Sequence, residues 1–100
     1  MIERHVTFNV IPGKENDFEA LFKEAYSVAM AKQPGFVSVT LLKEHEKEGV
    51  YRMVIRFQSL ETAAAWRNSD DHKALSPRIK TLHTGSTVQV YDVISGLQEQ

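Results

Sequence analysis

The segment of residues 50–58 constrains the fold of this chain most strongly, because its side chains alternate in character along its whole length. One set of alternate positions is apolar throughout: Tyr51, Met53, Ile55 and Phe57. The other set mixes valine with arginine: Val50, Arg52, Val54 and Arg56. This period is typical of a strand whose two faces meet different surroundings. Ser59 can then cap a helix that has Glu61 in its first turn and carries the only tryptophan, Trp66.

Three further segments are predicted to be strands. Residues 2–11 alternate between an apolar side and a polar side. The apolar side consists of Ile2, Val6, Phe8 and Val10, and the polar side of Glu3, His5, Thr7 and Asn9. Residues 36–43 are apolar on both sides, which indicates cover on both faces, and residues 86–94 form another apolar strand. A charged hairpin loop is expected at residues 44–49.

Helical periodicity replaces alternation in residues 14–33, which Pro34 and Gly35 bring to an end. The apolar stripe of this helix is predicted to be Phe18, Leu21, Phe22, Ala25 and Ala29. In residues 70–82, Pro77 is expected to interrupt the helix and to push Ser76 towards extended geometry. Only a short helix is therefore predicted in that segment.

The resulting order, β-α-β-β-α-β, predicts a ferredoxin-like α+β fold with an antiparallel sheet and both helices on one face. Residues 1–96 are expected to form the domain and residues 97–100 a polar C-terminal tail. Two helices leave the other sheet face bare, and monomers rarely expose a contiguous apolar patch of that size. We therefore expect a homodimer packed through that face. The alternative is a solvated face decorated by Arg52 and Arg56.

Composition excludes several classes of function. The net charge of -1 and the pI near 6.4 give no indication of a nucleic-acid partner. The chain has no cysteine, and no segment approaches the roughly 20 apolar residues of a membrane helix. No signal peptide is recognised, so a cytoplasmic location and no membrane partner are expected. The histidines are too scattered to predict a metal site, and no hydrolase, nucleotide-binding or zinc-protease motif occurs.

Five short runs spread over the chain carry a family resemblance. They are Pro34-Gly35-Phe36, Leu41-Leu42, Tyr51-Arg52-Met53-Val54, Ser59-Leu60-Glu61-Thr62-Ala63, and Trp66 ahead of His72. Taken together, they resemble the antibiotic biosynthesis monooxygenase (ABM) domains over roughly residues 2–94. The resemblance implies a dimeric α/β barrel built from ferredoxin-like subunits. It also implies either oxidation of aromatic phenols or quinols by O₂ without a cofactor, or haem degradation.

Each branch of the family places particular residues around its tryptophan, which Trp66 matches here. The haem-degrading branch has a strand-one asparagine where Thr7 stands, and a histidine where Leu75 or Ser76 stands. The cofactor-free branch has an asparagine one helical turn before the tryptophan, where Thr62 stands. The sequence therefore departs from both patterns at these positions.

The candidate site combines these residues with polar and aromatic side chains elsewhere. The predicted catalytic residues are His72, Trp66 and Asn9, with Trp66 as the wall of a pocket between helices and sheet and His72, His5 or Asn9 as the base. The predicted substrate-binding residues are His5, Thr7, Thr62, Tyr26 and Phe22. For each of these residues an ordinary core or solvated role is the alternative.

The leading functional hypothesis is a small monooxygenase of the ABM type that oxidises a planar aromatic or quinol-like substrate with O₂ and no cofactor. The first alternative is a haem-binding or haem-degrading monooxygenase. The second is a dimer that binds a small molecule without catalysis.

Overall fold

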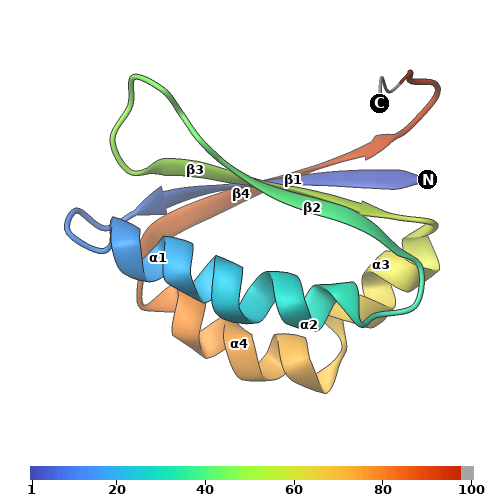
Figure 1. Ribbon diagram of the computed structural model, residues 1–100, viewed down its shortest axis with the longest axis horizontal. Helices are drawn as coiled ribbons and strands as arrows, with labels where there is room; N and C mark the ends of the chain where they lie inside the picture. The colour runs from blue at the N-terminus through green and yellow to red at the C-terminus, as the bar shows by residue number, and fades with distance from the viewer. Residues whose placement is uncertain (98–100) are drawn as a thin grey trace.

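The computed structural model describes residues 1–97 and contains one antiparallel sheet with all helices on the same face (Figure 1). The elements are β1 (Ile2–Val10), α1 (Glu15–Leu21), η1 (Phe22–Tyr26), α2 (Ser27–Ala31), β2 (Phe36–Lys43), β3 (Val50–Phe57), α3 (Leu60–Arg67), α4 (Asp70–Lys80) and β4 (His83–Asp92). The strands lie in the order β2-β3-β1-β4. The predicted ferredoxin-like fold is confirmed.

The two central strands, β3 and β1, divide their side chains between a covered face and an open face. On β3, the four alternate apolar residues that begin with Tyr51 are all buried beneath the helices. β1 pairs with β3 so that Phe8 lies opposite Tyr51 and Ile2 opposite Phe57, which places its own apolar set on the same side. The hydrophobic core is therefore the layer between the sheet and the helices.

The first helix is continuous in space but changes its winding at η1, a π-helical turn. A π turn adds one residue to the helical repeat, so it shifts the side that faces the sheet. Phe18 and Leu21 are buried before the turn, and Tyr26 and Met30 are buried after it. The predicted positions Ala25 and Ala29 pack only partly against the core, because the buried side has moved on by one residue.

The last helix corrects the prediction for residues 70–82. α4 runs through Pro77 and reaches Lys80, with Ser76 inside the helix. Leu75 and Ile79 are buried on either side of the exposed proline, so packing of these two residues offsets the one hydrogen bond that proline cannot donate. The predicted N-cap of α3 is confirmed: Ser59 accepts from the backbone N–H of Thr62 at 3.1 Å, within a reciprocal capping box.

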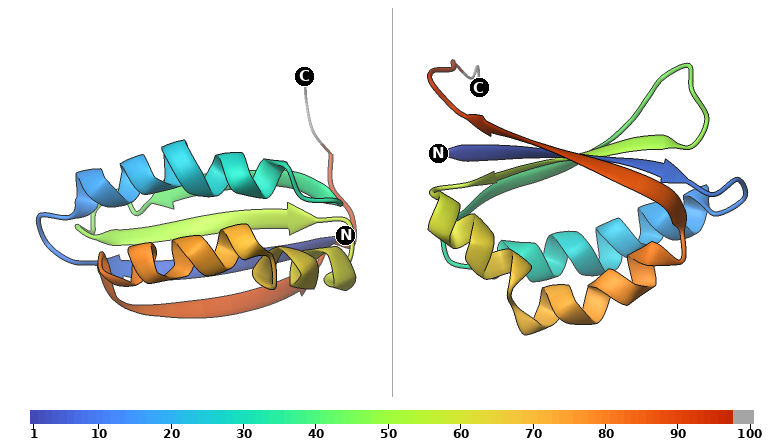
Figure 2. Two further views of the ribbon diagram at one scale, coloured as in Figure 1. Left: turned by 90° about the horizontal axis from the view of Figure 1, so that it is seen from below. Right: turned by 180° about the vertical axis from the view of Figure 1, so that it is seen from behind.

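β4 begins and ends earlier than predicted, at residues 83 and 92 instead of 86 and 94. It pairs with β1 along an edge of the sheet, beside the helical row of α3 and α4 (Figure 2, left). Its helix-side residues Val88 and Val90 keep about half of their surface exposed, at 49% and 53%. The helical layer therefore leaves this edge open.

Only Leu97 of the predicted tail lies within the described residues, and it is almost fully exposed; residues 98–100 lie outside them. Within residues 1–97, no helix combines the length and the apolar character needed to cross a membrane.

Gly35, in the connection from α2 to β2, allows a test of the close contact between this connection and α3. Its φ of +78° disfavours any side chain, and an added Cβ would lie 2.5 Å from the Thr62 side chain of α3. We expect Gly35→Ala to lower the free energy of unfolding by about 2–4 kcal/mol, measured by urea denaturation.

Two other glycines separate the causes of that loss. Gly13 has a φ of +88° but open space around it, so Gly13→Ala should cost only the backbone strain of about 1–2 kcal/mol. Gly85 has neither constraint, and Gly85→Ala should change stability by less than about 0.5 kcal/mol. Equal losses at Gly35 and Gly13 would show that the contact with Thr62 relaxes freely.

Candidate functional site

A cavity of about 260 Å³ lies between the covered face of the sheet and the helical layer. β1 contributes Arg4, Val6 and Phe8 to its lining, and β3 and β4 supply further walls. Trp66 and Arg67 of α3 face residues from α4, including His72 and Ser76. This volume lies just below the roughly 300–1,000 Å³ of typical small-molecule sites, so the cavity suits a small ligand.

The connection between α3 and α4 fixes Trp66 and His72 relative to one another. The Ser69 hydroxyl donates to the Trp66 carbonyl at 2.7 Å and accepts from the backbone N–H of His72 at 3.2 Å. One side chain therefore closes α3 and caps α4. The imidazole stands edge-on to the buried indole, with ring centroids 5.2 Å apart and an interplanar angle of 88°. The predicted catalytic residues Trp66 and His72 are thus brought together.

Tyr26 joins this pair because the π turn rotates it towards the sheet. Its ring packs against Trp66 at 6.3 Å in a T-shaped arrangement, and only 5% of the residue is exposed. Burial raises the pKa of the Tyr26 phenol to about 12. The group therefore stays protonated at neutral pH and can donate a hydrogen bond.

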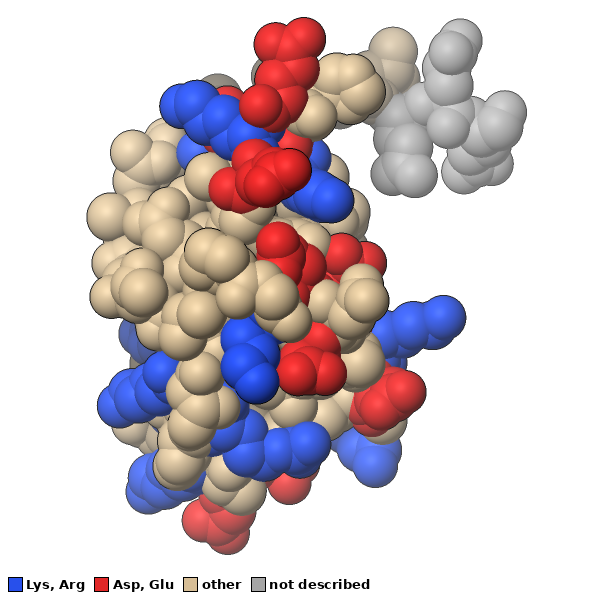
Figure 3. All heavy atoms as spheres, turned by 90° about the vertical axis from the view of Figure 1, so that its left-hand side faces the viewer, with Lys and Arg blue, Asp and Glu red and all other residues tan. Residues whose placement is uncertain are grey.

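The ionisable groups that line the cavity are all basic or neutral. Arg4, Arg67 and Lys80 line it, and no carboxylate among residues 1–97 does. Burial lowers the pKa of the Arg4 guanidinium, and the nearby Arg67 lowers it further. By contrast, the surface in Figure 3 shows acidic and basic side chains interspersed. The excess of positive charge is a property of the cavity.

His72 responds to this environment. Burial lowers the pKa of its imidazole below the ordinary 6.5, and the charges of Arg4 and Arg67 lower it further. The folded protein therefore holds His72 neutral at pH 7, in the form that accepts a proton.

The sequence analysis did not identify Arg4 and His83 as site residues. Arg4 occupies an apolar-side position of β1 between Ile2 and Val6. A charged residue in an otherwise apolar row was the sequence feature that could have identified it as a site residue. His83 starts β4 and reaches the same cavity as His72, with its ring 5.1 Å from Phe8. Within residues 1–97, no three His, Asp or Glu side chains are grouped closely enough to hold a metal ion.

The polar row of β1 faces away from this cavity. His5, Thr7 and Asn9 alternate with the cavity-lining residues, so they lie on the open face of the sheet. His5, Thr7 and Asn9 therefore do not share a pocket with Trp66. The Glu3 carboxylate accepts from His5 Nε2 and from Arg56 Nε, each at 2.6 Å. These two bonds lower the pKa of Glu3, the one from His5 most.

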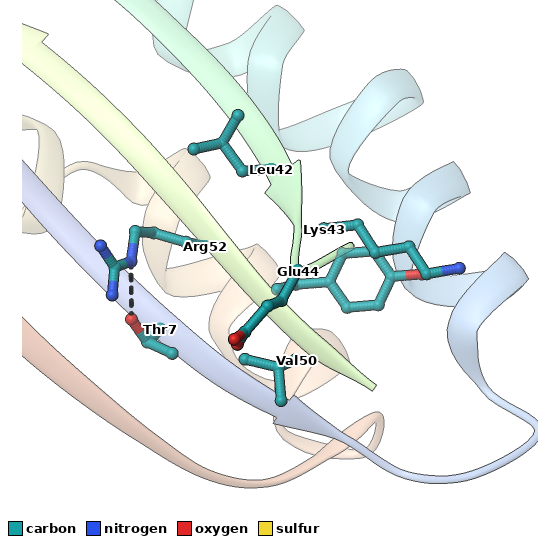
Figure 4. A pocket seen from close by; sticks show the side chains of 7 residues that line it. Thr7, Leu42, Lys43, Glu44, Val50 and Arg52 are labelled. Atoms are coloured by element: carbon teal, nitrogen blue, oxygen red, sulfur yellow. Dashed lines mark hydrogen bonds between the residues drawn. The ribbon is translucent and has the colours of Figure 1, made fainter. Parts of the chain in front are cut away.

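A second hollow, of about 340 Å³, lies near the β2–β3 hairpin (Figure 4). Arg52 Nε donates to the Thr7 hydroxyl at 3.1 Å across its floor, and Leu42 and Glu44 approach from the β2 side. Thr7 therefore belongs to this hollow, and Asn9 is exposed beyond it.

Two predicted binding residues serve elsewhere in the structure. The Thr62 hydroxyl accepts from the backbone N–H of Ser59 at 3.1 Å as part of the capping box, and Thr62 is absent from the cavity lining. Phe22 packs against the core and lines a separate shallow pocket beside Tyr51. Of the residues that family members use, only the tryptophan has a counterpart in the cavity.

Comparison with known proteins identifies the family. The model of the antibiotic biosynthesis monooxygenase family matches residues 1–78. The chain belongs to this family. A search of curated protein sequences returns no match.

Several solved structures share its fold. SnoaB, a cofactor-independent oxygenase from Streptomyces nogalater, is 23% identical over 98% of this chain and 97% of its own, with a TM-score of 0.86. A point mutant of MhuD, with two manganese protoporphyrin IX bound per active site, is 23% identical over 99% and 100%, with a TM-score of 0.84. A conserved protein from Methanosarcina mazei Go1 is 19% identical over 90% and 89%, with a TM-score of 0.82.

The charge environment of His72 gives a direct test of the site geometry. In an NMR titration, the His72 imidazole should titrate below 6.5, and Arg67→Gln should raise its pKa because one like charge is removed. Arg78→Gln is the matched control, since Arg78 is exposed on α4 and does not line the cavity. A His72 pKa at or above 6.5, or equal effects of the two variants, would contradict the arrangement.

Proposed function

We propose that this ABM protein is a cofactor-independent monooxygenase that oxidises a planar aromatic or quinol-like substrate with O₂ in the cavity beside Trp66. The observation that carries the proposal is the pair of Trp66 and His72. A neutral imidazole stands at the wall of a narrow aromatic cavity, with basic side chains around it. SnoaB, which has the same fold, is a cofactor-independent oxygenase.

His72 acts as the general base in this proposal. It removes the proton of a phenolic hydroxyl, or of a methylene group beside an aromatic ketone, and so produces an electron-rich anion. Arg4, which is half-buried, and Arg67, which is exposed, line the cavity, and their positive charges stabilise the negative charge that develops. Tyr26 donates its phenolic hydrogen to a substrate oxygen.

The anion then reacts with O₂ directly. For an anthrone, the ring CH₂ becomes C=O: one oxygen atom enters the product, and the other leaves as water with the two hydrogens of the methylene. This four-electron oxidation of carbon balances the four-electron reduction of O₂, so no external reductant is required.

A second candidate is haem binding, supported by two imidazoles and several basic side chains in one cavity and by the fold shared with MhuD. The imidazole of His72 or of His83 suits an iron centre, and Arg4, Arg67 and Lys80 suit the carboxylates of a porphyrin. However, β1 presents Arg4, Val6 and Phe8 to the cavity and no asparagine, and Leu75 or Ser76 stands where the resemblance places the histidine of the haem-degrading branch. The small volume also favours the smaller aromatic substrate.

Oxidation of an anthrone tests the proposal and separates the two candidates. In an oxygen-electrode assay, His72→Gln should lower kcat/KM by about 10²–10⁴-fold because the base is lost. His45→Gln, in the exposed hairpin loop, should leave turnover unchanged. The wild-type rate should fall as the pH drops through the pKa of His72, which lies below the ordinary 6.5, because the imidazole then becomes protonated.

Two outcomes, one from the oxygen electrode and one that also requires an absorption spectrum with haemin, would contradict the monooxygenase. One is O₂ uptake that is unaffected by His72→Gln. The other is an absence of uptake combined with a haemin Soret band that is lost in His72→Gln, which would favour the haem candidate.

A homodimer packed through the open face of the sheet is part of the proposal, and a cytoplasmic location stays a prediction. The helices cover only the opposite face (Figure 1). Leu42 and Tyr91 lie on the open face and keep 47% and 45% of their surface exposed. Glu3 is neutralised there by Arg56, which reduces the cost of covering this face.

Light scattering after size-exclusion chromatography measures the assembly. The wild-type mass should be twice 11.4 kDa, and Val54→Glu, at the centre of the open face, should return it to 11.4 kDa because it buries an unpaired charge. Val28→Glu, exposed on α2, should leave the dimer intact. A monomeric wild-type protein would refute this assembly.

A further inference from the structure

Arg4 is a charged residue on the helix-covered face of the sheet, where its neighbours on β1 are apolar. It lies on the helix side of β1, opposite Ile55 of β3 and Val90 of β4, in a row that otherwise contains only apolar residues. Its Nε is fully buried and has no hydrogen-bond partner among the described residues. A buried N–H of a charged group without an acceptor is destabilising, so its presence in a folded protein requires an explanation.

The described surroundings of Arg4 supply no counter-charge. Arg67 and Lys80 share the cavity, as do His72 and His83, and none of the described lining residues is a carboxylate. The like charge of Arg67 acts on Arg4 and adds to the effect of burial in lowering the pKa of Arg4. The Nδ1 of His83 is a second buried polar atom in the same lining without a partner in the described part of the chain. The cavity is therefore complementary to an anion.

We propose that the natural substrate is an aromatic carboxylic acid whose carboxylate pairs with Arg4 while its ring system lies against Trp66. This inference rests on the proposed function and names the substrate class of that same site. A guanidinium offers parallel N–H donors that match the two oxygens of a carboxylate, and this pairing both strengthens and orients the contact. Arg4 then acts as a specificity-determining residue.

A carboxylate explains the unpaired Nε of Arg4 better than the reacting anion does. The phenolate or enolate acquires its charge only after His72 has taken the proton, whereas the positive charge of Arg4 and its unpaired Nε are present before any substrate is bound. A carboxylate is charged at neutral pH when it enters, so it satisfies Arg4 in the ground state. Its charge also opposes that of Arg4, which makes His72 a stronger base once substrate has bound.

Isothermal titration calorimetry with two unreactive ligands tests the inference. Naphthalene-2-carboxylate and naphthalene-2-carboxamide have nearly the same shape and differ in charge. We expect the wild-type protein to bind the carboxylate about 10- to 100-fold more tightly, as expected for a charge-assisted pair. Arg4→Gln should abolish that preference, and Arg78→Gln, with the same change of charge outside the cavity, should keep it.

The thermal midpoint of the ligand-free variants separates binding from a structural role. Arg4→Gln should be as stable as the wild-type protein or more stable, because it removes a partly buried charge whose buried Nε has no hydrogen-bond partner among the described residues. A large fall in the midpoint would show that Arg4 supports the fold and would overturn its assignment to the substrate.

Equal affinities for the two ligands would also overturn the inference, as would no measurable binding of the carboxylate or a preference that survives in Arg4→Gln. Neither ligand has a hydroxyl or methylene group to oxidise, so the result does not depend on turnover. If Arg4 selects the carboxylate but the protein does not oxidise anthrones with O₂, the inference about carboxylate binding is supported and the proposed monooxygenase activity is refuted.

Discussion

Cover on a single face of the sheet is the constraint from which the other features follow. Neighbouring residues on a strand point to opposite faces, so each β1 side chain enters either the helix-covered layer or the open face. Arg4, Val6 and Phe8 therefore share one cavity with Trp66, while His5 and Thr7, their immediate neighbours, are separated from it by the sheet itself. The side of the sheet that the helices cover therefore determines which β1 side chains lie beside Trp66 and which lie outside the cavity.

Alternation and capping made the fold predictable. The β3 pattern identified both its strand and its buried side, and Ser59 marked the start of α3 because a hydroxyl at that position satisfies a free N–H of the first turn. The predicted interruption of the helix at Pro77 was wrong because the prediction used the local backbone preference of proline and did not include tertiary packing. The burial of Leu75 and Ile79 maintains α4 across a residue that an isolated helix would not tolerate.

The site was harder to predict than the fold, since it depends on how segments meet in space. Trp66 and His72 were recognised because they are close in sequence and because Trp66 matches the family, and Ser69 joins their backbones. The position of Tyr26 depends on a π turn that has no clear periodic signal. Assignment of the polar β1 row to the same pocket required the identity of the covered face, which alternation alone does not specify. Arg4 carried a usable signal, a charge in an apolar row.

The positive charges in the cavity affect both the fold and the proposed chemistry. Arg4 and Arg67 repel one another and oppose protonation of His72. They thereby favour the neutral form of His72, which the proposed mechanism requires of a base, and in that mechanism they favour an anion beside it. A cavity lined only by apolar residues would avoid the repulsion between the two arginines, but it would provide neither the lowered pKa of His72 nor a counter-charge for an anion.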